Sequence, residues 1–101
     1  MDIQRIRQII ARLNAARILV VGDFFLDQYL DIDRRLEETS IETGLPAHQV
    51  TSIRNSPGAA GNVATNLASL GVQTSALTVL GKDGNGYELL RQLQNHNIDT
   101  Q

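Results

Sequence analysis

A short apolar run near the N-terminus restricts most strongly what this chain can fold into. Ile18 to Val21 are four consecutive large apolar residues, and Gly22 ends the run. A continuous run of this kind is typical of a strand buried on both faces, as in a parallel sheet covered by helices. The run therefore predicts an α/β fold, with Gly22 turning the chain at the C-terminal end of the strand.

Three other stretches have the apolar spacing of amphipathic helices. The first covers residues 3–14, and Asp2 is its expected N-cap. The second starts at Asn62 and ends before Gly71, a residue that is favoured directly after a helix. The third includes residues 87–93. These helices would cover the faces of the buried strand.

A second buried strand is predicted between the second and third helices, at residues 74–80. The turn that follows, residues 81–86, contains Lys82 as a solvated side chain and Asp83 as the expected N-cap of the third helix. The order strand, helix, strand implies a crossover connection and hence a parallel sheet. Residues 98–101 lie where another strand would start, so one sheet edge stays open and the fold is expected to be truncated.

The segment between the first strand and the second helix has a different pattern. Residues 29–32 and 49–54 are typical of more exposed strands, and the polar residues 34–43 between them are expected to form a loop. Residues 56–58 contain proline and glycine and are predicted to end the second of these strands. We expect the two pieces to form a small antiparallel flap.

Composition excludes several classes of function. The 101 residues suffice for one small domain, and a formal charge of −2 with scattered Lys and Arg gives no basic patch for nucleic acid or membrane. The absence of cysteine excludes disulfides and thiolate metal sites. No apolar run is long enough to span a membrane, and the first residues lack the apolar centre of a secretory signal. We therefore expect a cytoplasmic protein with no nucleic-acid or membrane partner.

Asp23 and Asp27 directly follow the first buried strand. Ligands of open α/β sheets bind beyond the carboxyl ends of the strands. A carboxylate at that place can accept hydrogen bonds from two neighbouring hydroxyl groups of a sugar or polyol. The structural alternative is that Asp23 caps the turn and Asp27 is only solvated.

A run of small residues precedes the second helix. Gly58, Ala59 and Gly61 would let backbone N–H groups approach a ligand at the helix N-terminus, and Asn62 adds an amide that donates and accepts. The run is not a Walker loop, because no Lys-Ser/Thr pair follows the glycines, and the spacing fits a dinucleotide fingerprint poorly. The structural alternative is a tight turn with Asn62 as helix N-cap.

In this order and spacing, the motifs resemble the N-terminal third of PfkB-type, ribokinase-like sugar kinases. The resemblance covers almost the whole chain and rests on three blocks: Ile18-Leu19-Val20-Val21-Gly22-Asp23…Asp27, Gly58-Ala59-Ala60-Gly61-Asn62-Val63-Ala64…Leu67-Ala68…Leu70-Gly71 and Val79-Leu80-Gly81-Lys82-Asp83…Gly86. The segment from Gly22 to Tyr29, together with the long flap, is most similar to the heptose-7-phosphate kinase branch.

The resemblance implies a partial ribokinase-like fold over residues 1–101, a parallel βαβ sheet with a small antiparallel β-lid at about residues 29–55. It implies transfer of the γ-phosphoryl group of ATP to a hydroxyl of a sugar or sugar phosphate, with Mg²⁺ accompanying ATP in full-length relatives. It also implies that Asp27 and Asn62 bind sugar hydroxyls near the Gly58 backbone. The expected substrate-binding residues are Asp23, Asp27, Gly58, Ala59 and Asn62. The lid carries the dimer contact in many relatives, so a homodimer is an expected assembly.

The chain departs from the family pattern in two respects. Pro57 stands where relatives often have the first glycine of a pair, and it lacks a backbone N–H. The late Gly-Ala-Gly-Asp segment, which supplies the catalytic base and anion hole of relatives, does not occur in residues 1–101. We therefore expect no catalytic residue, no metal ligand and no ATP site here, and no kinase activity of this chain alone. The alternative is a non-catalytic dimerisation or sugar-sensing module built on the lid.

Overall fold

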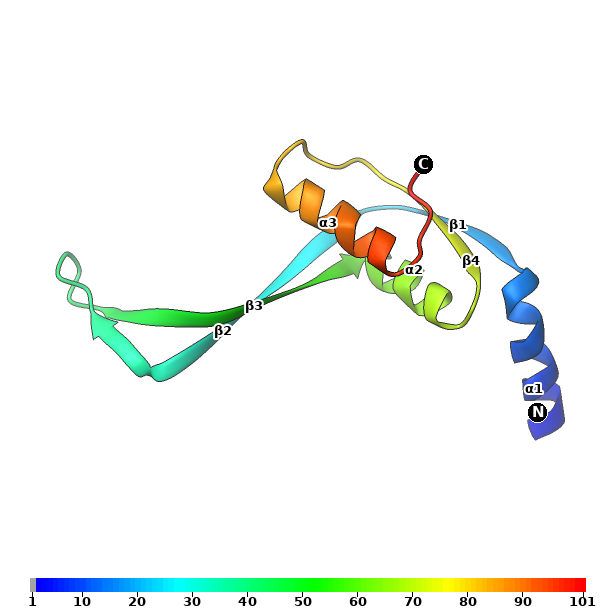
Figure 1. Ribbon diagram of the computed structural model, residues 1–101, viewed down its shortest axis with the longest axis horizontal. Coiled ribbons are helices and arrows are strands. Elements are labelled where there is room, and N and C mark those ends of the chain that lie inside the picture. The colour runs from blue at the N-terminus through cyan, green and yellow to red at the C-terminus, as the bar shows by residue number, and fades with distance from the viewer. Residues whose placement is uncertain (1) are drawn as a thin grey trace.

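The computed structural model describes residues 2–101 as two small sheets and three helices (Figure 1). In chain order the elements are α1 (Ile3–Arg12), a 3₁₀ turn (Leu13–Ala15), β1 (Arg17–Val21), β2 (Phe24–Thr39), β3 (Pro46–Ala59), α2 (Ala60–Ser69), β4 (Gln73–Leu77) and α3 (Gly84–Asn95). This order confirms the predicted α/β class, with a parallel pair and an antiparallel hairpin.

β1 and β4 lie side by side as a parallel pair, and α2 makes the crossover between them. The register places Arg17 opposite Gln73 and Val21 opposite Leu77. A parallel bridge between Ser75 and residue Asp99 then begins a third strand position, at the place where the sequence predicted a further strand. β4 ends before the predicted strand over residues 74–80 does, because its last residue, Leu77, is opposite Val21, the last residue of β1.

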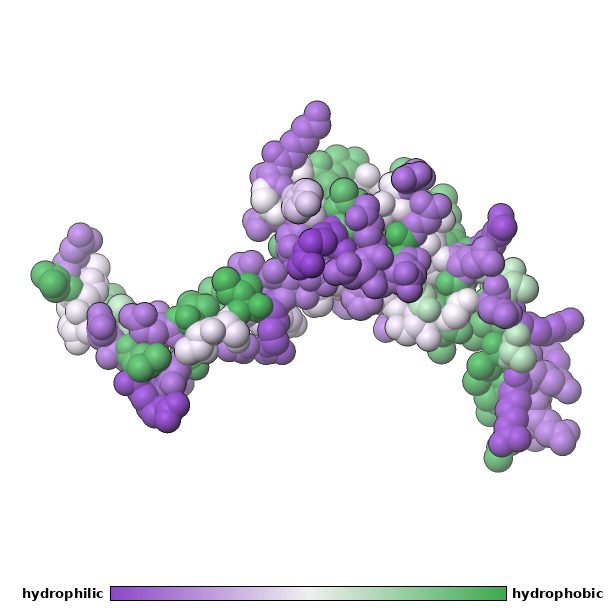
Figure 2. Space-filling view, in the orientation of Figure 1, coloured by the Kyte–Doolittle hydropathy of each residue, from purple (hydrophilic) through white to green (hydrophobic). Residues whose placement is uncertain are grey.

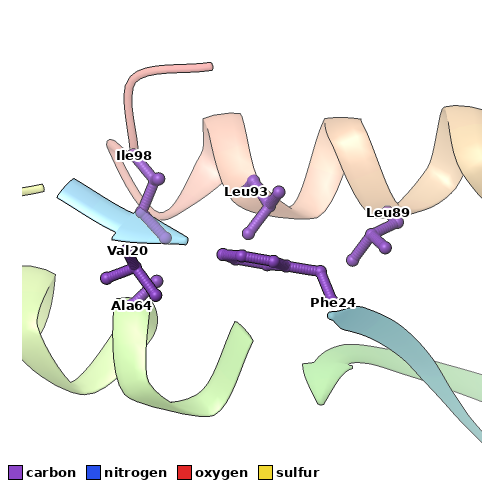
Figure 3. Packing of buried hydrophobic residues seen from close by; sticks show 6 residues of the cluster. All are labelled: Val20, Phe24, Ala64, Leu89, Leu93 and Ile98. Atoms are coloured by element: carbon purple, nitrogen blue, oxygen red, sulfur yellow. The ribbon is translucent and has the colours of Figure 1, made fainter. Parts of the chain in front are cut away.

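The hydrophobic core lies on one face of this parallel pair (Figure 3). Its buried members come from β1, the start of β2, α2, α3 and the segment after α3: Val20, Phe24, Ala64, Leu89, Leu93 and Ile98. The other face of the pair exposes Leu19, Val21 and Leu77, each by more than half. The prediction that the first strand is buried on both faces is therefore wrong for the described residues, since α2 and α3 pack against only one face.

β2 and β3 form a hairpin that projects away from the core (Figure 1). Its pairs run from Phe24 opposite Ala59 at the base to Thr39 opposite Pro46 near the tip, with two register shifts along the way. With the hairpin at one end and α1 at the other (Figure 1), the molecule has a longest dimension of 62 Å. An antiparallel flap was predicted, and it is much longer than the residue pattern indicated.

The predicted loop over residues 34–43 is wrong in its first half, because β2 continues to Thr39. Charged side chains in this part stay exposed and pair locally, as Arg35 does with Asp33 at 2.8 Å. Such charged pairs carry little desolvation penalty in a two-stranded ribbon, because both of its faces are exposed to water. Polarity therefore marked an exposed strand here rather than a loop.

Residues 56–58 were predicted to break the flap, and this prediction is also wrong. They lie inside β3, where Pro57 is opposite Leu26 and Gly58 is opposite Phe25. Each strand of a two-stranded sheet has one unpaired edge, so a proline that lacks an N–H donor is tolerated there.

Two helix starts are as predicted, and one differs. Asp2 accepts a hydrogen bond from the backbone N–H of Arg5 (2.7 Å), and Asp83 accepts one from Gly86 (2.8 Å), so both are N-caps. α2 begins at Ala60 directly after β3, which places Asn62 inside its first turn. The structural alternative that Asn62 is the N-cap is therefore wrong. None of the described helices is long and apolar enough to cross a membrane.

Candidate functional site

The candidate site lies at the base of the hairpin, where β1 ends, β2 and β3 pair, and α2 begins. The backbone N–H of Ala60 donates to the carbonyl oxygen of Asp23 at 2.9 Å. Phe24 is paired with Ala59 and buried in the core, which holds the two strands against the body of the molecule. The first and second sequence motifs, more than thirty residues apart in the chain, therefore meet at one place.

The carboxylate of Asp27 lies directly over Gly58. A Cβ atom placed on Gly58 would lie 2.6 Å from Cγ of Asp27 and closer still to one carboxylate oxygen, so only glycine fits there. Asp27 is half-buried and is opposite Ser56 in the register. The side chain is thus more enclosed than the solvated alternative for Asp27 assumed.

Asp31 lies further along the same face of β2, and its carboxylate is fully engaged by neighbouring side chains. It accepts hydrogen bonds from Ser52 (2.7 Å) and from Nε and Nη2 of Arg54 (2.9 and 3.0 Å). The hydrogen bond from Arg54, and then that from Ser52, hold the pKa of Asp31 below its usual value. The Asp27 carboxylate has no such partner among residues 2–101, so its oxygens are free to accept hydrogen bonds from a ligand.

The link from β3 to α2 is strained. Ala59 has φ 53° and ψ −121°, a conformation that L-residues rarely adopt and that glycine adopts easily. Strain of this kind costs on the order of 1–3 kcal/mol and is concentrated at functional sites. Here it turns the chain sharply, so that α2 starts directly beside Gly58.

The N-terminus of α2 has no side-chain cap. The first N–H groups of a helix have no partner within the helix, and they carry the positive end of the helix dipole. Asn62 lies in this first turn with an exposed side chain, and Asp23 is exposed on the other side of the link. The structure gives no hydrogen bond between the Asn62 side chain and Asp27, so these two predicted site residues share a neighbourhood without direct contact.

Pro57 and Gly61 explain how the small residues pack. A Cβ on Gly61 would lie 2.5 Å from Cβ of Pro57, so the first turn of α2 can approach β3 only with glycine at this position. Pro57 and Gly61 are both buried. The departure from a glycine pair thus leaves a close contact in place while removing one N–H donor.

Sequence reasoning missed a polar cluster behind the hairpin. Asn55 in β3 donates to Glu88 in α3 at 3.3 Å and accepts from Gln28 in β2 at 3.1 Å. Hydrogen bonds from Arg91, then Gln92, lower the pKa of Glu88 from 4.5 to about 2. Neither residue belongs to a motif, and no local pattern pairs positions 33 residues apart, so the sequence held no signal for this contact.

Metal binding has no site in the described part of the chain. Among residues 2–101, no group of three or more His, Cys, Asp or Glu side chains could hold a metal ion.

Tyr29 is exposed on the hairpin, with the Arg54 guanidinium 5.3 Å from its ring centre. The ring is therefore part of the packing of the hairpin face.

Comparison with known proteins decides the family. A family model described as "pfkB family carbohydrate kinase" matches residues 15–101. The chain belongs to the PfkB family of carbohydrate kinases. The match covers β1, the hairpin, α2, β4 and α3 of the PfkB chain and starts after α1.

Relatives show how much of a PfkB protein is present. The Bifunctional protein HldE of Trichlorobacter lovleyi is 36% identical over 100 residues, which are 99% of this chain and 20% of that protein. The Bifunctional protein HldE of Citrifermentans bemidjiense is 39% identical over 94 residues, 93% of this chain and 19% of that protein. The chain thus spans about a fifth of the length of these curated relatives.

Solved structures confirm the fold. A carbohydrate kinase from Agrobacterium tumefaciens matches with a TM-score of 0.61 and 21% identity, over 83% of this chain and 25% of that one. Our PfkB chain is therefore a partial ribokinase-like α/β fold, as its sequence predicted.

Proposed function

We propose that this chain is the sugar-binding, N-terminal portion of an ATP-dependent carbohydrate kinase. The observation that carries the proposal is the unpaired carboxylate of Asp27, held over Gly58 beside the uncapped N-terminus of α2. A carboxylate and the N–H groups of a helix's first turn that follow Ala60 are complementary to neighbouring sugar hydroxyls, which both donate and accept hydrogen bonds.

Each residue has a distinct part in the proposed site. Asp27 accepts hydrogen bonds from two sugar hydroxyls, and Asn62 donates to or accepts from another. The backbone at Gly58 and Ala59 brings the sugar close to the start of α2, and Asp23 borders the site on the β1 side. The substrate class is a sugar or sugar phosphate, and the resemblance of the segment from Gly22 to Tyr29 and the long flap to the heptose-7-phosphate kinase branch favours a heptose 7-phosphate.

The chemical step requires groups that residues 1–101 do not supply. In the proposed kinase, ATP gives its γ-phosphoryl group, as the Mg²⁺ complex, to a hydroxyl of the sugar held here. Phosphoryl transfer depends on positioning and on charge stabilisation around the transferred group. This chain contributes the positioning of the acceptor sugar, and the hairpin is its lid.

A second candidate function is supported by the apolar side of the hairpin. Leu30 is opposite Ile53 and Ile32 is opposite Val50, and all four side chains are 43–57% exposed. Figure 2 shows apolar side chains gathered along the projecting hairpin. Exposed apolar patches mark interaction sites. The lid of a second copy is the partner that fits, so we propose a homodimer through the lid, which a non-catalytic module could also use.

A coupled ATP-consumption assay separates these functions. With a panel of sugars and sugar phosphates, residues 1–101 alone are expected to give no turnover above a no-protein control, because catalytic base and anion hole are missing. The complete protein is expected to consume ATP with a sugar in the panel. Turnover by residues 1–101 would contradict the division of roles. A complete protein that dimerises without any turnover would favour the non-catalytic module.

A further inference from the structure

The hairpin is attached to the body of the molecule by a chain of three polar side chains. Gln28 Nε2 donates to Asn55 Oδ1 at 3.1 Å, and Asn55 Nδ2 donates to Glu88 Oε1 at 3.3 Å. Asn55 uses both ends of its amide, which fixes its orientation between β2 and α3. This links both strands of the hairpin to one helix.

Glu88 is itself held in place on α3. Arg91 donates to its two oxygens at 2.9 and 2.7 Å, and Gln92 donates to Oε1 at 2.9 Å. Its side chain is 22% exposed. Because these bonds keep its pKa near 2, Glu88 stays ionised in neutral and mildly acidic solution and remains a strong acceptor for Asn55.

These linked hydrogen bonds lie at the point where the hairpin leaves the body of the molecule. On the base side, Phe24 is buried against Leu89 and Leu93 of α3 (Figure 3). On the tip side, the next pair, Tyr29 opposite Arg54, is exposed. Among the described residues, the hydrogen bonds beyond this point stay within the hairpin. The contact between Asn55 and Glu88 is therefore the last one that sets the direction in which the hairpin leaves the body.

The same strand pair carries the candidate site on its opposite face. Side chains alternate between faces along a strand, so Phe24 and Gln28 point toward α3 while Asp27 points away from it. In β3, Asn55 is opposite Gln28 and faces α3, whereas its neighbour Ser56 is opposite Asp27 on the other face. A rotation of the hairpin about its base would move Asp27 relative to the N-terminus of α2.

We propose that Asn55 and Glu88 are positioning residues, which lock the hairpin to α3 and so hold Asp27 in the geometry that binds the sugar. Only the consequence for sugar binding rests on the proposed function. The effect of Asn55 and Glu88 on the orientation of the hairpin can be tested without any sugar.

The first test measures that orientation in the complete protein. Spin labels at Ile41→Cys, at the exposed hairpin tip, and at Gln94→Cys, on the exposed side of α3, report the distance between hairpin and body. Residues 1–101 contain no cysteine, so labelling within this part is confined to the two introduced sites. One narrow distance distribution is expected, and Asn55→Ala or Glu88→Ala should broaden it. Unchanged distributions in both variants would overturn the proposal.

Arg35→Ala is the matched control, because it removes an ion pair with Asp33 within the hairpin and leaves the bond from Asn55 to Glu88 and its supporting partners intact. It should leave the distance distribution narrow. Asn55→Ala combined with Glu88→Ala should broaden it no further than either alone, since both remove one contact. Additive broadening would show that the two residues act separately and would also overturn the proposal.

The second test is kinetic. Asn55→Ala and Glu88→Ala should raise the sugar KM about three- to tenfold while the ATP KM stays unchanged. Glu88→Gln, which retains Oε1 as an acceptor, should raise the sugar KM much less than Glu88→Ala does. Broadened distances with an unchanged sugar KM would refute the link between lock and site. Unchanged sugar affinity in Asp27→Ala would refute the proposed function, and the measurement of hairpin orientation would still test the contact between Asn55 and Glu88.

Discussion

Gly58→Ala is expected to lower the sugar affinity of the complete protein by about 10- to 100-fold, because the displaced carboxylate of Asp27 loses its hydrogen bonds to the sugar. The new Cβ would lie 2.6 Å from Cγ of Asp27, so the carboxylate must leave its place over the strand. β3 cannot shift away easily, because Ala59 is already strained and α2 follows at once. Calorimetric titration with the sugar is the measurement.

Gly84→Ala provides the matched control. A Cβ there meets nothing within 4 Å, and the residue is the first of α3, where alanine is compatible with the helix. Its sugar affinity should equal that of the unaltered protein. Equal affinities for Gly58→Ala and Gly84→Ala would show that the contact between Gly58 and Asp27 has no part in binding.

Phe24→Ala is expected to lower the free energy of unfolding by about 3–5 kcal/mol, the range for truncating a buried phenylalanine. Phe24 is 5% exposed and joins the base of the hairpin to the core residues of α3. The loss should appear in urea unfolding followed by circular dichroism. Phe25→Ala, on the neighbouring residue that is 58% exposed, should cost far less. Similar losses in the two variants would contradict the assigned core.

The elements that the sequence predicted well are those set by local physics. The apolar run before Gly22 became β1, and the helical spacing after residue 60 became α2. Asp2 and Asp83 cap helices because a side-chain oxygen three residues ahead of a free N–H is a short-range contact. Gly71 has φ 91°, as expected for the residue that ends α2.

The features that escaped prediction depend on partners distant in the chain. Pro57 reads as a breaker in isolation, yet a strand with a free edge accommodates it. The conformation of Ala59 is imposed by β3 and α2 together, because alanine itself disfavours it. The contact between Asn55 and Glu88 exists only once the hairpin rests on α3. For the site, the residue pattern indicated Asp27 and Gly58 separately, the family resemblance implied that both lie near the sugar, and only the fold placed one over the other.

The most direct test of the central claim is calorimetric titration of the complete protein and its Asp27→Ala variant with the sugar and, separately, with ATP. If Asp27 accepts hydrogen bonds from the sugar, its loss should weaken sugar binding by about 1.5–3 kcal/mol and change ATP binding little. Unchanged sugar affinity in Asp27→Ala would contradict the assignment of this site, and an equal loss of ATP affinity would point to general damage instead.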